Sequence, residues 1–246
     1  MKLFILIVML VFSGCVTTGN SVDKTKLAEG YYTKGLSYLQ EKNYELASVE
    51  FNRSLQNDNT YKWSYYGLGY ISDEQGKLDD ALKYYEKAID QDADFSEAYN
   101  ALGFVYAKQK KWKEAVKAYN KALKNKLYTT PHIPYGNLGD LYMQQKDYVK
   151  AAEAYRESKR FAKLEVTIIN LGNALLQAGN IHEAISELRE GVALAPQNAN
   201  MRYSLALAFL KDGNKKAALA EFNKAVELAP KSELARLAND YIKTLR

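Results

Sequence analysis

Cysteine and histidine are nearly absent from this chain of 246 residues, which has one cysteine, Cys15, and two histidines, His132 and His182. A single cysteine excludes a disulfide within the chain and any cysteine-based metal cluster. The chain also has no G-x-x-x-x-G-K-[ST] phosphate loop and no H-E-x-x-H zinc motif. Because the residues that usually build catalytic and metal centres are scarce, we expect no enzyme activity, no metal site and no cofactor.

A strong charge of either sign is missing too. The chain has 34 Lys and Arg against 29 Asp and Glu, for a formal net charge of +5. This excess is too mild to indicate nucleic acid. We therefore predict neither a nucleic-acid partner nor a small-molecule substrate.

The apolar run at residues 3–12 is too short to span a bilayer, which needs roughly 20 apolar residues. It follows Lys2 and leads into Phe12-Ser13-Gly14-Cys15, which resembles a bacterial lipobox. A basic start, an apolar stretch and small residues before a cut predict a signal peptide, here over residues 1–14. The lipobox resemblance implies cleavage before Cys15 and acylation of that cysteine, palmitate included. The alternative is a plain signal peptide that is cut elsewhere.

Residues 15–27 are predicted to connect the lipidated cysteine to the folded body. Val16 follows Cys15 where an Asp would signal retention in the inner membrane, so this lipoprotein pattern implies an outer-membrane anchor that faces the periplasm. The rest of the segment is polar and has no apolar period. We expect it to be a flexible tether.

A short pattern of small residues returns six times and organises the rest of the chain. The first small residue of each copy is followed twelve residues later by an alanine, and successive copies are separated by 34, 34, 36, 33 and 34 residues. A small residue on one helix lets a second helix approach closely, while large residues fill the space between them. A period of 34 with this pattern is that of the tetratricopeptide repeat, a helix–turn–helix unit. The small residues are Gly35, Gly69, Gly103, Gly139, Gly172 and Ala206, and the alanines are Ala47, Ala81, Ala115, Ala151, Ala184 and Ala218.

The pattern predicts an all-α, right-handed tetratricopeptide-repeat solenoid of six helix pairs with a C-terminal capping helix. One helix pair cannot bury its apolar face alone, so the pairs are expected to stack. Apolar residues at helical spacing beyond the last repeat predict the cap over residues 233–246. The repeats are placed at about 28–61, 62–95, 96–131, 132–164, 165–198 and 199–232.

The inner face of the solenoid is the candidate binding surface. In tetratricopeptide solenoids, positions 2, 5, 9 and 12 of each first helix line a concave groove, and here aromatic residues occupy many of them in the first three repeats. Tyrosine and tryptophan give large contact areas, and asparagine can hold a peptide backbone by its N–H and C=O. The alternative is that the aromatic side chains only fill gaps between successive helices. The candidate groove residues are Tyr32, Leu36, Trp63, Tyr66, Tyr70, Asn100, Phe104, Asn137, Asn173 and Tyr203, and further positions of repeats four to six are Ile133, Asp140, Met143, Val166, Ile169, Leu176, Asn200, Leu207 and Leu210.

A second candidate surface is a row of lysines on the second helix of repeat three. Lys113, Lys117, Lys121 and Lys124 follow one another at spacings of 4, 4 and 3, which places them on one helix face. Such a row is typical of a solvated convex face. Alternatively it meets anionic headgroups, at about 1 kcal/mol per lysine.

The lipobox with Val16-Thr17-Thr18-Gly19, the six repeats and the capping helix together resemble the pilotin-like tetratricopeptide lipoproteins of type IV pilus biogenesis. The connection Leu127-Tyr128-Thr129-Thr130-Pro131, which leads into Asn137-Leu138-Gly139, is similar to that family's middle repeats. The resemblance implies an outer-membrane protein that helps a secretin ring to localise or assemble. The predicted function is thus that of a non-enzymatic, lipid-anchored scaffold that binds a secretin subunit in its groove. An adaptor for peptidoglycan-modifying enzymes, or for another envelope complex, is the alternative.

Overall fold

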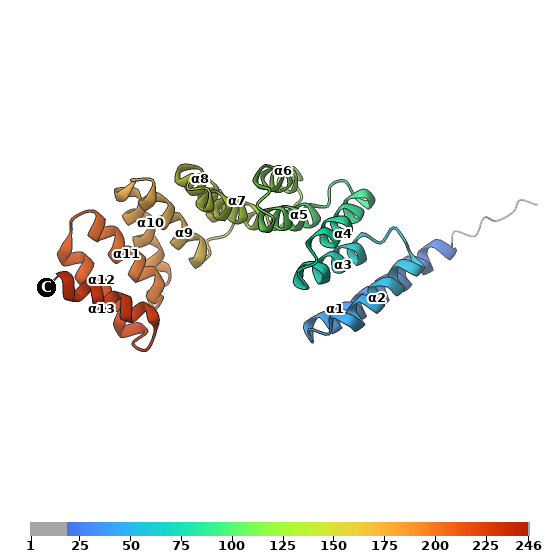
Figure 1. Ribbon diagram of the computed structural model, residues 1–246, viewed down its shortest axis with the longest axis horizontal. Coiled ribbons are helices and arrows are strands. Elements are labelled where there is room, and N and C mark those ends of the chain that lie inside the picture. The colour runs from blue at the N-terminus through green and yellow to red at the C-terminus, as the bar shows by residue number, and fades with distance from the viewer. Residues whose placement is uncertain (1–18, 246) are drawn as a thin grey trace, which may run out of the picture.

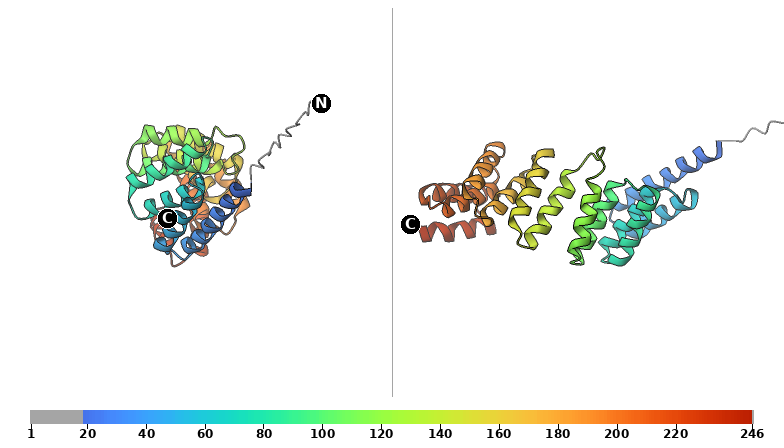
Figure 2. Two further views of the ribbon diagram at one scale, coloured as in Figure 1. Left: turned by 90° about the vertical axis from the view of Figure 1, so that its right-hand side faces the viewer. Right: turned by 90° about the horizontal axis from the view of Figure 1, so that it is seen from above.

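The computed structural model describes residues 19–245, with side chains from residue 24 on. Within this range the chain forms thirteen α-helices and no strand, which confirms the predicted all-α solenoid. The helices form an elongated arch, and its two ends bend toward the same side (Figures 1 and 2). In chain order they are α1 (Gly19–Gln40), α2 (Tyr44–Asn57), α3 (Lys62–Glu74), α4 (Leu78–Gln91), α5 (Ser96–Lys108), α6 (Trp112–Ala122), α7 (His132–Gln144), α8 (Tyr148–Phe161), α9 (Glu165–Gln177), α10 (Ile181–Leu194), α11 (Ala199–Lys211), α12 (Lys215–Leu228) and α13 (Glu233–Leu245).

Each helix pair closes on a small residue of its first helix and a large residue of its second. A Cβ atom added at Gly103 would lie 2.7 Å from two ring carbons of Tyr119, and one at Gly69 would lie 2.6 Å from the Tyr85 ring. Real Cβ atoms do not approach other atoms so closely, so only glycine permits this packing. The predicted role of the small residues is confirmed. In the other glycine-containing pairs, Gly35 meets Phe51, Gly139 meets Tyr155 and Gly172 meets Leu188.

The turn within each pair has one residue in the left-handed region of backbone space. Gly76, Gly179 and Gly213 occupy it in three repeats, with φ of +72°, +85° and +78°. Lysine occupies it in the other three repeats, at Lys42, Lys110 and Lys146 with φ of 57°, 59° and 59°. Left-handed backbone is unstrained for glycine and costs energy for lysine.

The hydrophobic core differs between the two halves of the arch. From Ala151 to Ile242, buried side chains of α8 to α13 form one continuous cluster. The N-terminal half contains several smaller clusters, such as the one around Tyr85 and Leu102 and the one around Ala47 and Phe51. The C-terminal repeats therefore share a core, whereas the N-terminal repeats are joined by separate contacts.

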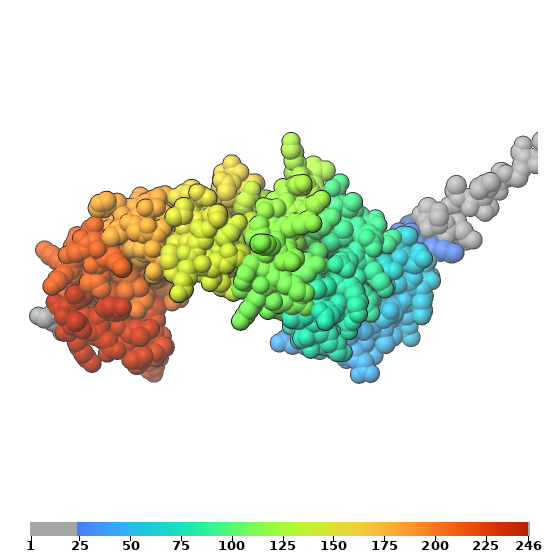
Figure 3. Space-filling view, turned by 45° about the horizontal axis from the view of Figure 1, so that its top comes forward, coloured from blue at the N-terminus to red at the C-terminus, as the bar shows by residue number. Residues whose placement is uncertain are grey.

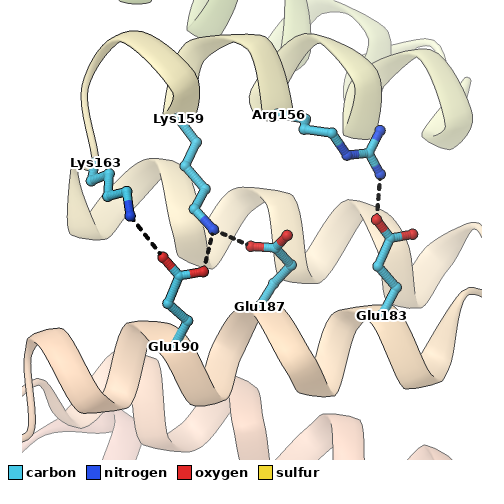
Figure 4. A network of polar contacts seen from close by, with 6 residues as sticks. All are labelled: Arg156, Lys159, Lys163, Glu183, Glu187 and Glu190. Carbon is cyan, nitrogen blue, oxygen red and sulfur yellow. Dashed lines mark hydrogen bonds and ion pairs between the residues drawn. The ribbon is translucent and has the colours of Figure 1, made fainter.

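A row of ion pairs links α8 to α10 on the outer side of the C-terminal half (Figure 4). The Lys159 amine lies 2.5 Å from the Glu187 carboxylate and 2.7 Å from that of Glu190. Arg156 pairs with Glu183 at 2.6 Å. With Lys159 only 12% exposed, these pairs fix two neighbouring second helices to each other.

The expectation of a flexible tether is wrong for residues 19–27, which belong to α1. Ala28 is fully buried, and the Thr25 hydroxyl donates a hydrogen bond to Asp58 at 2.9 Å. Once α2 holds one part of α1, each added helical residue gains a backbone hydrogen bond without a new nucleation cost. The remaining tether residues, Cys15 with its predicted lipid, and the predicted signal peptide lie outside the described residues.

Candidate functional site

Two neighbouring hollows lie between the first helices of the C-terminal half. The larger has a volume of about 640 Å³ between α9, α11 and α13, and the second has about 550 Å³ and also reaches α7. Asn173 and Leu207 line both, so the two hollows form one groove. We call this surface the C-terminal groove.

The repeat itself brings the groove residues into register. Helices α9, α11 and α13 begin at residues 165, 199 and 233, so the same position in each helix recurs every 34 residues. Equivalent positions of stacked repeats lie side by side. The groove consequently contains three rows, which are Val166, Asn200 and Leu234 at position 2, Ile169, Tyr203 and Leu237 at position 5, and Asn173, Leu207 and Tyr241 at position 9.

The groove is apolar with few polar groups. The side-chain amide of Asn173 can donate and accept a hydrogen bond in the middle of the groove. Glu165 and Asn198 bond to each other at the edge of one hollow, and Lys211 lines the other. Apolar walls with a few placed polar groups suit a peptide whose apolar side chains enter the groove.

Aromatic packing behind the groove fixes its wall. Phe222 is fully buried, and its ring stacks on that of Tyr241 at 5.0 Å between centroids. The same Phe222 ring meets Tyr203 edge-on at 5.5 Å. Burial, followed by the nearby Tyr241, raises the pKa of the Tyr203 hydroxyl. A tyrosine hydroxyl is protonated at neutral pH and can donate a hydrogen bond to a ligand.

Three of the predicted aromatic groove residues, Tyr32, Trp63 and Tyr66, are half-buried and pack in an aromatic chain that joins successive repeats. Trp63 lies 6.4 Å from Tyr32, 6.0 Å from Tyr66 and 4.7 Å from Phe95, all between ring centroids. Burial raises the pKa of Tyr32 and of Tyr66 to about 12, with smaller contributions from neighbouring tyrosines and, for Tyr66, from Glu97. These contacts match the alternative in which aromatic side chains fill gaps between helices.

Other predicted residues of the N-terminal half are accessible. Leu36, Tyr70 and Phe104 are 36%, 40% and 44% exposed. The Lys108 amine lies 4.7 Å from the centre of the Phe104 ring and 2.7 Å from the carboxylate of Asp73. These three side chains can therefore contribute contact area to a bound partner.

Asn100 and Asn137 meet across α5 and α7. The Asn137 side-chain amide donates a hydrogen bond to the Asn100 carbonyl oxygen at 2.9 Å. Among the described residues, the side-chain nitrogen Nδ2 of Asn100 and the side-chain oxygen Oδ1 of Asn137 make no hydrogen bond. The pair thus offers one donor and one acceptor to a ligand that lies along the inner side of the arch.

Sequence reasoning missed the part that α13 takes in the groove. Leu234, Leu237 and Tyr241 line the two hollows, although α13 was expected only to cap the last repeat. The signal was present, because the three residues occupy positions 2, 5 and 9 of a helix that begins 34 residues after α11. Applying the groove positions to a seventh first helix would have identified them.

The histidines are placed apart from the groove. His182 is 94% exposed, and its Nδ1 lies 3.5 Å from Asp212. The backbone carbonyl of His132 accepts a hydrogen bond from the Ser158 hydroxyl. Among the described residues no group of His, Cys, Asp and Glu side chains could hold a metal ion. Within that same part of the chain, no helix is both long and apolar enough to cross a membrane.

Stacked helix pairs with an apolar groove on the inner side define a helical-repeat scaffold for binding other polypeptides. Models of the tetratricopeptide repeat match residues 28–61, 74–110, 94–163 and 169–233. The chain belongs to the tetratricopeptide-repeat family, whose members typically act as scaffolds that bind protein partners.

Several solved structures have the same fold. PilF of Pseudomonas aeruginosa superposes with a TM-score of 0.74 at 20% identity, over 91% of this chain and 100% of that one. PilW, a widely conserved type IV pilus biogenesis factor, has a TM-score of 0.70 at 20% identity, over 89% and 98% of the two chains. YrrB, a tetratricopeptide-repeat protein with an unusual peptide-binding site, has a TM-score of 0.63 at 21% identity, over 77% and 97%. At these identities the likeness is one of fold.

A Haemophilus influenzae protein described as uncharacterized is 31% identical over 77 residues. The matched region is 31% of this chain and 43% of that protein, so the chain spans less than half the length of this curated relative.

Proposed function

We propose that the protein is a non-enzymatic envelope scaffold that is lipid-anchored through Cys15 and binds a segment of a protein partner on its inner side. The lipobox-like sequence before Cys15 supports the anchor, and Val16 after it supports the outer membrane. The observation that carries the binding function is the C-terminal groove, in which three rows of equivalent residues form one apolar surface around Asn173.

The partner segment presents apolar side chains at regular intervals. Its backbone bonds to Asn173, and its apolar groups contact Ile169, Leu207 and Leu237. The exposed side chains of Tyr70 and Phe104 and the Asn100–Asn137 pair extend the contact toward the N-terminal half. Binding energy is expected to concentrate in a few of these contacts, because hot spots carry most of the energy of an interface.

The proposed partner is an outer-membrane secretin subunit of a type IV pilus system. The sequence resemblance to pilus lipoproteins and the shared fold with PilF and PilW support this choice. An adaptor for peptidoglycan-modifying enzymes uses the same groove and anchor, and the identity of the captured partner distinguishes the two.

The first experiment tests the groove. The double variant Asn173→Ala, Leu237→Ser removes a polar and an apolar contact from the groove, and Leu194→Ser is the matched control, since Leu194 is 56% exposed outside it. Photocrosslinking in the native envelope, from an unnatural residue at position 207, should capture a secretin subunit. The double variant should reduce this product at least tenfold, and the control should not. Capture of a peptidoglycan enzyme supports the alternative partner, while equal capture by all three proteins moves the site elsewhere.

The second experiment tests the anchor. Cys15→Ala should leave the repeats folded, as measured by circular dichroism, and should release the mature protein from the outer-membrane fraction, because acyl chains supply the stable attachment. Unchanged retention in the membrane fraction would contradict lipidation.

A further inference from the structure

A surface on the outer side of the arch carries a concentrated positive charge. It extends over α6 and its flanking turns and consists of seven exposed lysines, Lys110, Lys111, Lys113, Lys117, Lys121, Lys124 and Lys126. We call it the lysine surface. Glu114 is the only acidic residue in the whole stretch from 98 to 139. The charge density here is far above that of the chain as a whole, whose net charge is only +5.

The lysine surface differs from the neighbouring second helices in having no internal neutralisation. Lys159 on α8, and Lys163 just after that helix, pair with carboxylates of α10 (Figure 4). None of the seven lysines lies within 4.0 Å of a carboxylate among the residues whose side chains the structure describes. Unpaired lysines in one region repel one another, so their field acts on whatever approaches from outside.

One apolar side chain stands at the edge of this charge. Leu127 directly follows Lys126 and is 87% exposed, more than any other large hydrophobic residue in the described part of the chain. The next residue, Tyr128, is buried and anchors the loop to the body. Beside α6, a hollow of about 310 Å³ is bordered by Lys117 and Lys121 and lined by Tyr99 and Tyr106. A basic surface with an exposed leucine combines electrostatic attraction with an apolar group that can enter a lipid layer.

The shape of the molecule selects among anionic partners. α6 lies on the outer side of the arch, away from the direction in which both ends bend (Figure 1). The green segment that includes α6 crosses the middle of the molecule in the space-filling view, with a narrow projection at its upper edge (Figure 3). A convex body meets a planar partner at the middle of its outer side, which is where the lysines and Leu127 are found. A flexible acidic peptide would instead gain contact area in a concave surface.

The geometry points to the lysine surface as a peripheral contact with an anionic phospholipid bilayer. The lysines lie against the headgroups and Leu127 inserts between them. This contact orients the arch with its inner side, and therefore the C-terminal groove, away from the lipid. It does not depend on Cys15, and it does not depend on the identity of the groove partner.

The test measures co-sedimentation of the full chain with vesicles of pure phosphatidylcholine and with vesicles that contain 30% phosphatidylglycerol. The patch variant replaces Lys113, Lys117, Lys121 and Lys124 by glutamine. The control variant replaces Lys215, Lys216, Lys231 and Lys243, four exposed lysines of the C-terminal region, and so changes the net charge equally. For each protein, the partition coefficient with anionic vesicles is divided by that with neutral vesicles. The N-terminal segment is the same in all proteins, so its contribution cancels in this ratio.

The wild type and the control variant should bind the anionic vesicles at least tenfold more strongly than the neutral ones. The patch variant should lose most of this ratio, since each lysine near an anionic surface contributes about fivefold. In the wild-type background, Leu127→Ser should reduce binding to anionic vesicles severalfold. The ratio should also collapse in 1 M salt, where charges are screened within about 3 Å.

Equal loss in the patch and control variants would overturn the proposal, because net charge alone would then explain the binding. The proposal would also be overturned if the patch variant bound vesicles as the wild type does but no longer bound polyglutamate. In that case the lysine surface belongs to an acidic protein partner. Circular dichroism of each variant excludes unfolding as the cause.

Discussion

At the scale of single residues, the first five helix pairs depend on a glycine that faces a large ring or leucine, and Ala206 takes this place in the sixth. Gly103 and Tyr119 illustrate the point, because the ring occupies the space in which any Cβ would lie. Gly30 on α1 is the opposite case, with no atom within 4 Å of an added Cβ. The same residue type therefore serves close packing at one position and only weakens a helix at the other.

The first prediction contrasts these two glycines. Gly103→Ala should lower the free energy of unfolding by about 1–3 kcal/mol, because overpacking forces the Tyr119 ring or a helix to shift. Gly30→Ala should be neutral or should stabilise the protein by up to about 1 kcal/mol, because alanine favours helix. Urea unfolding followed by circular dichroism measures both values. Equal effects of the two substitutions would contradict the close approach of α5 and α6.

Burial of tyrosine side chains makes the free energy of unfolding depend on pH in the alkaline range. The pKa of Tyr66 is raised to about 12, mainly by burial, from 10.0 in the unfolded chain. The uncharged form is favoured in the fold, so its contribution is complete below pH 10 and is lost as pH rises toward 12. Each unit of pKa shift corresponds to about 1.4 kcal/mol, so the ionisation of Tyr66 can change the free energy of unfolding by up to about 3 kcal/mol.

The second prediction removes this ionisation. The free energy of unfolding should fall between pH 10 and pH 12 in both proteins. The fall should be about 2 kcal/mol smaller in Tyr66→Phe than in the wild type. Urea titrations at the two pH values, for wild type and variant, measure the difference. Some loss should remain, because burial also raises the pKa of Tyr85, Tyr119 and Tyr155. An unchanged pH dependence in the variant would mean that Tyr66 is not buried as described.

At the scale of elements, the turn inside each repeat has a conformation that its residue type does not always favour. Lys146 connects α7 to α8 with a φ of 59°, whereas Gly179 takes the equivalent place in the next repeat. A left-handed conformation costs an L-residue roughly 1–2 kcal/mol. Lysine is nevertheless present in three of the six turns, so these turns hold strain that packing of the helices must offset.

The third prediction relieves that strain. Lys146→Gly should raise the free energy of unfolding by about 1 kcal/mol, because glycine adopts this backbone without a steric penalty. Lys146→Ala is the control, since it removes the side chain but keeps the Cβ atom, and it should leave stability nearly unchanged. Thermal unfolding of the three proteins measures the effect. A gain of the same size in both variants would point to the lysine charge instead of the backbone.

Elements were easier to predict from this sequence than contacts. The small residues recur at fixed spacing and act within one repeat, so Gly35 and Gly172 indicate helix pairs without knowledge of the rest. Whether an aromatic residue faces solvent or the next repeat depends on neighbours far away in the chain. Tyr66 and Tyr70 illustrate this, because both occupy groove positions of one helix, yet the first packs on Phe95 and the second is 40% exposed. The helical start of α1 was hidden for a similar reason, because Thr25 there bonds to Asp58, which follows α2 and lies 33 residues further along the chain.

At the scale of the whole molecule, the two halves of the arch divide the tasks of stability and accessibility. The C-terminal half shares one core from α8 to α13 and forms the groove on its inner side. The N-terminal half is joined through smaller clusters and an aromatic chain. In repeat proteins, stability is approximately a sum of the repeats and their interfaces, so unequal interfaces produce unequal local stability.

The last prediction follows from this division. Amide hydrogens of α9 to α12 should exchange at least tenfold more slowly than those of α1 to α4, because opening the shared core exposes more apolar surface at once. Hydrogen exchange followed by mass spectrometry of peptides resolves the two regions. Gly172→Ala, which crowds Leu188, should speed exchange in the C-terminal half, and Gly35→Ala, which crowds Phe51, should speed it only near α1 to α4. Uniform protection along the chain, or a response of both halves to either substitution, would instead indicate that the arch unfolds as a single cooperative unit.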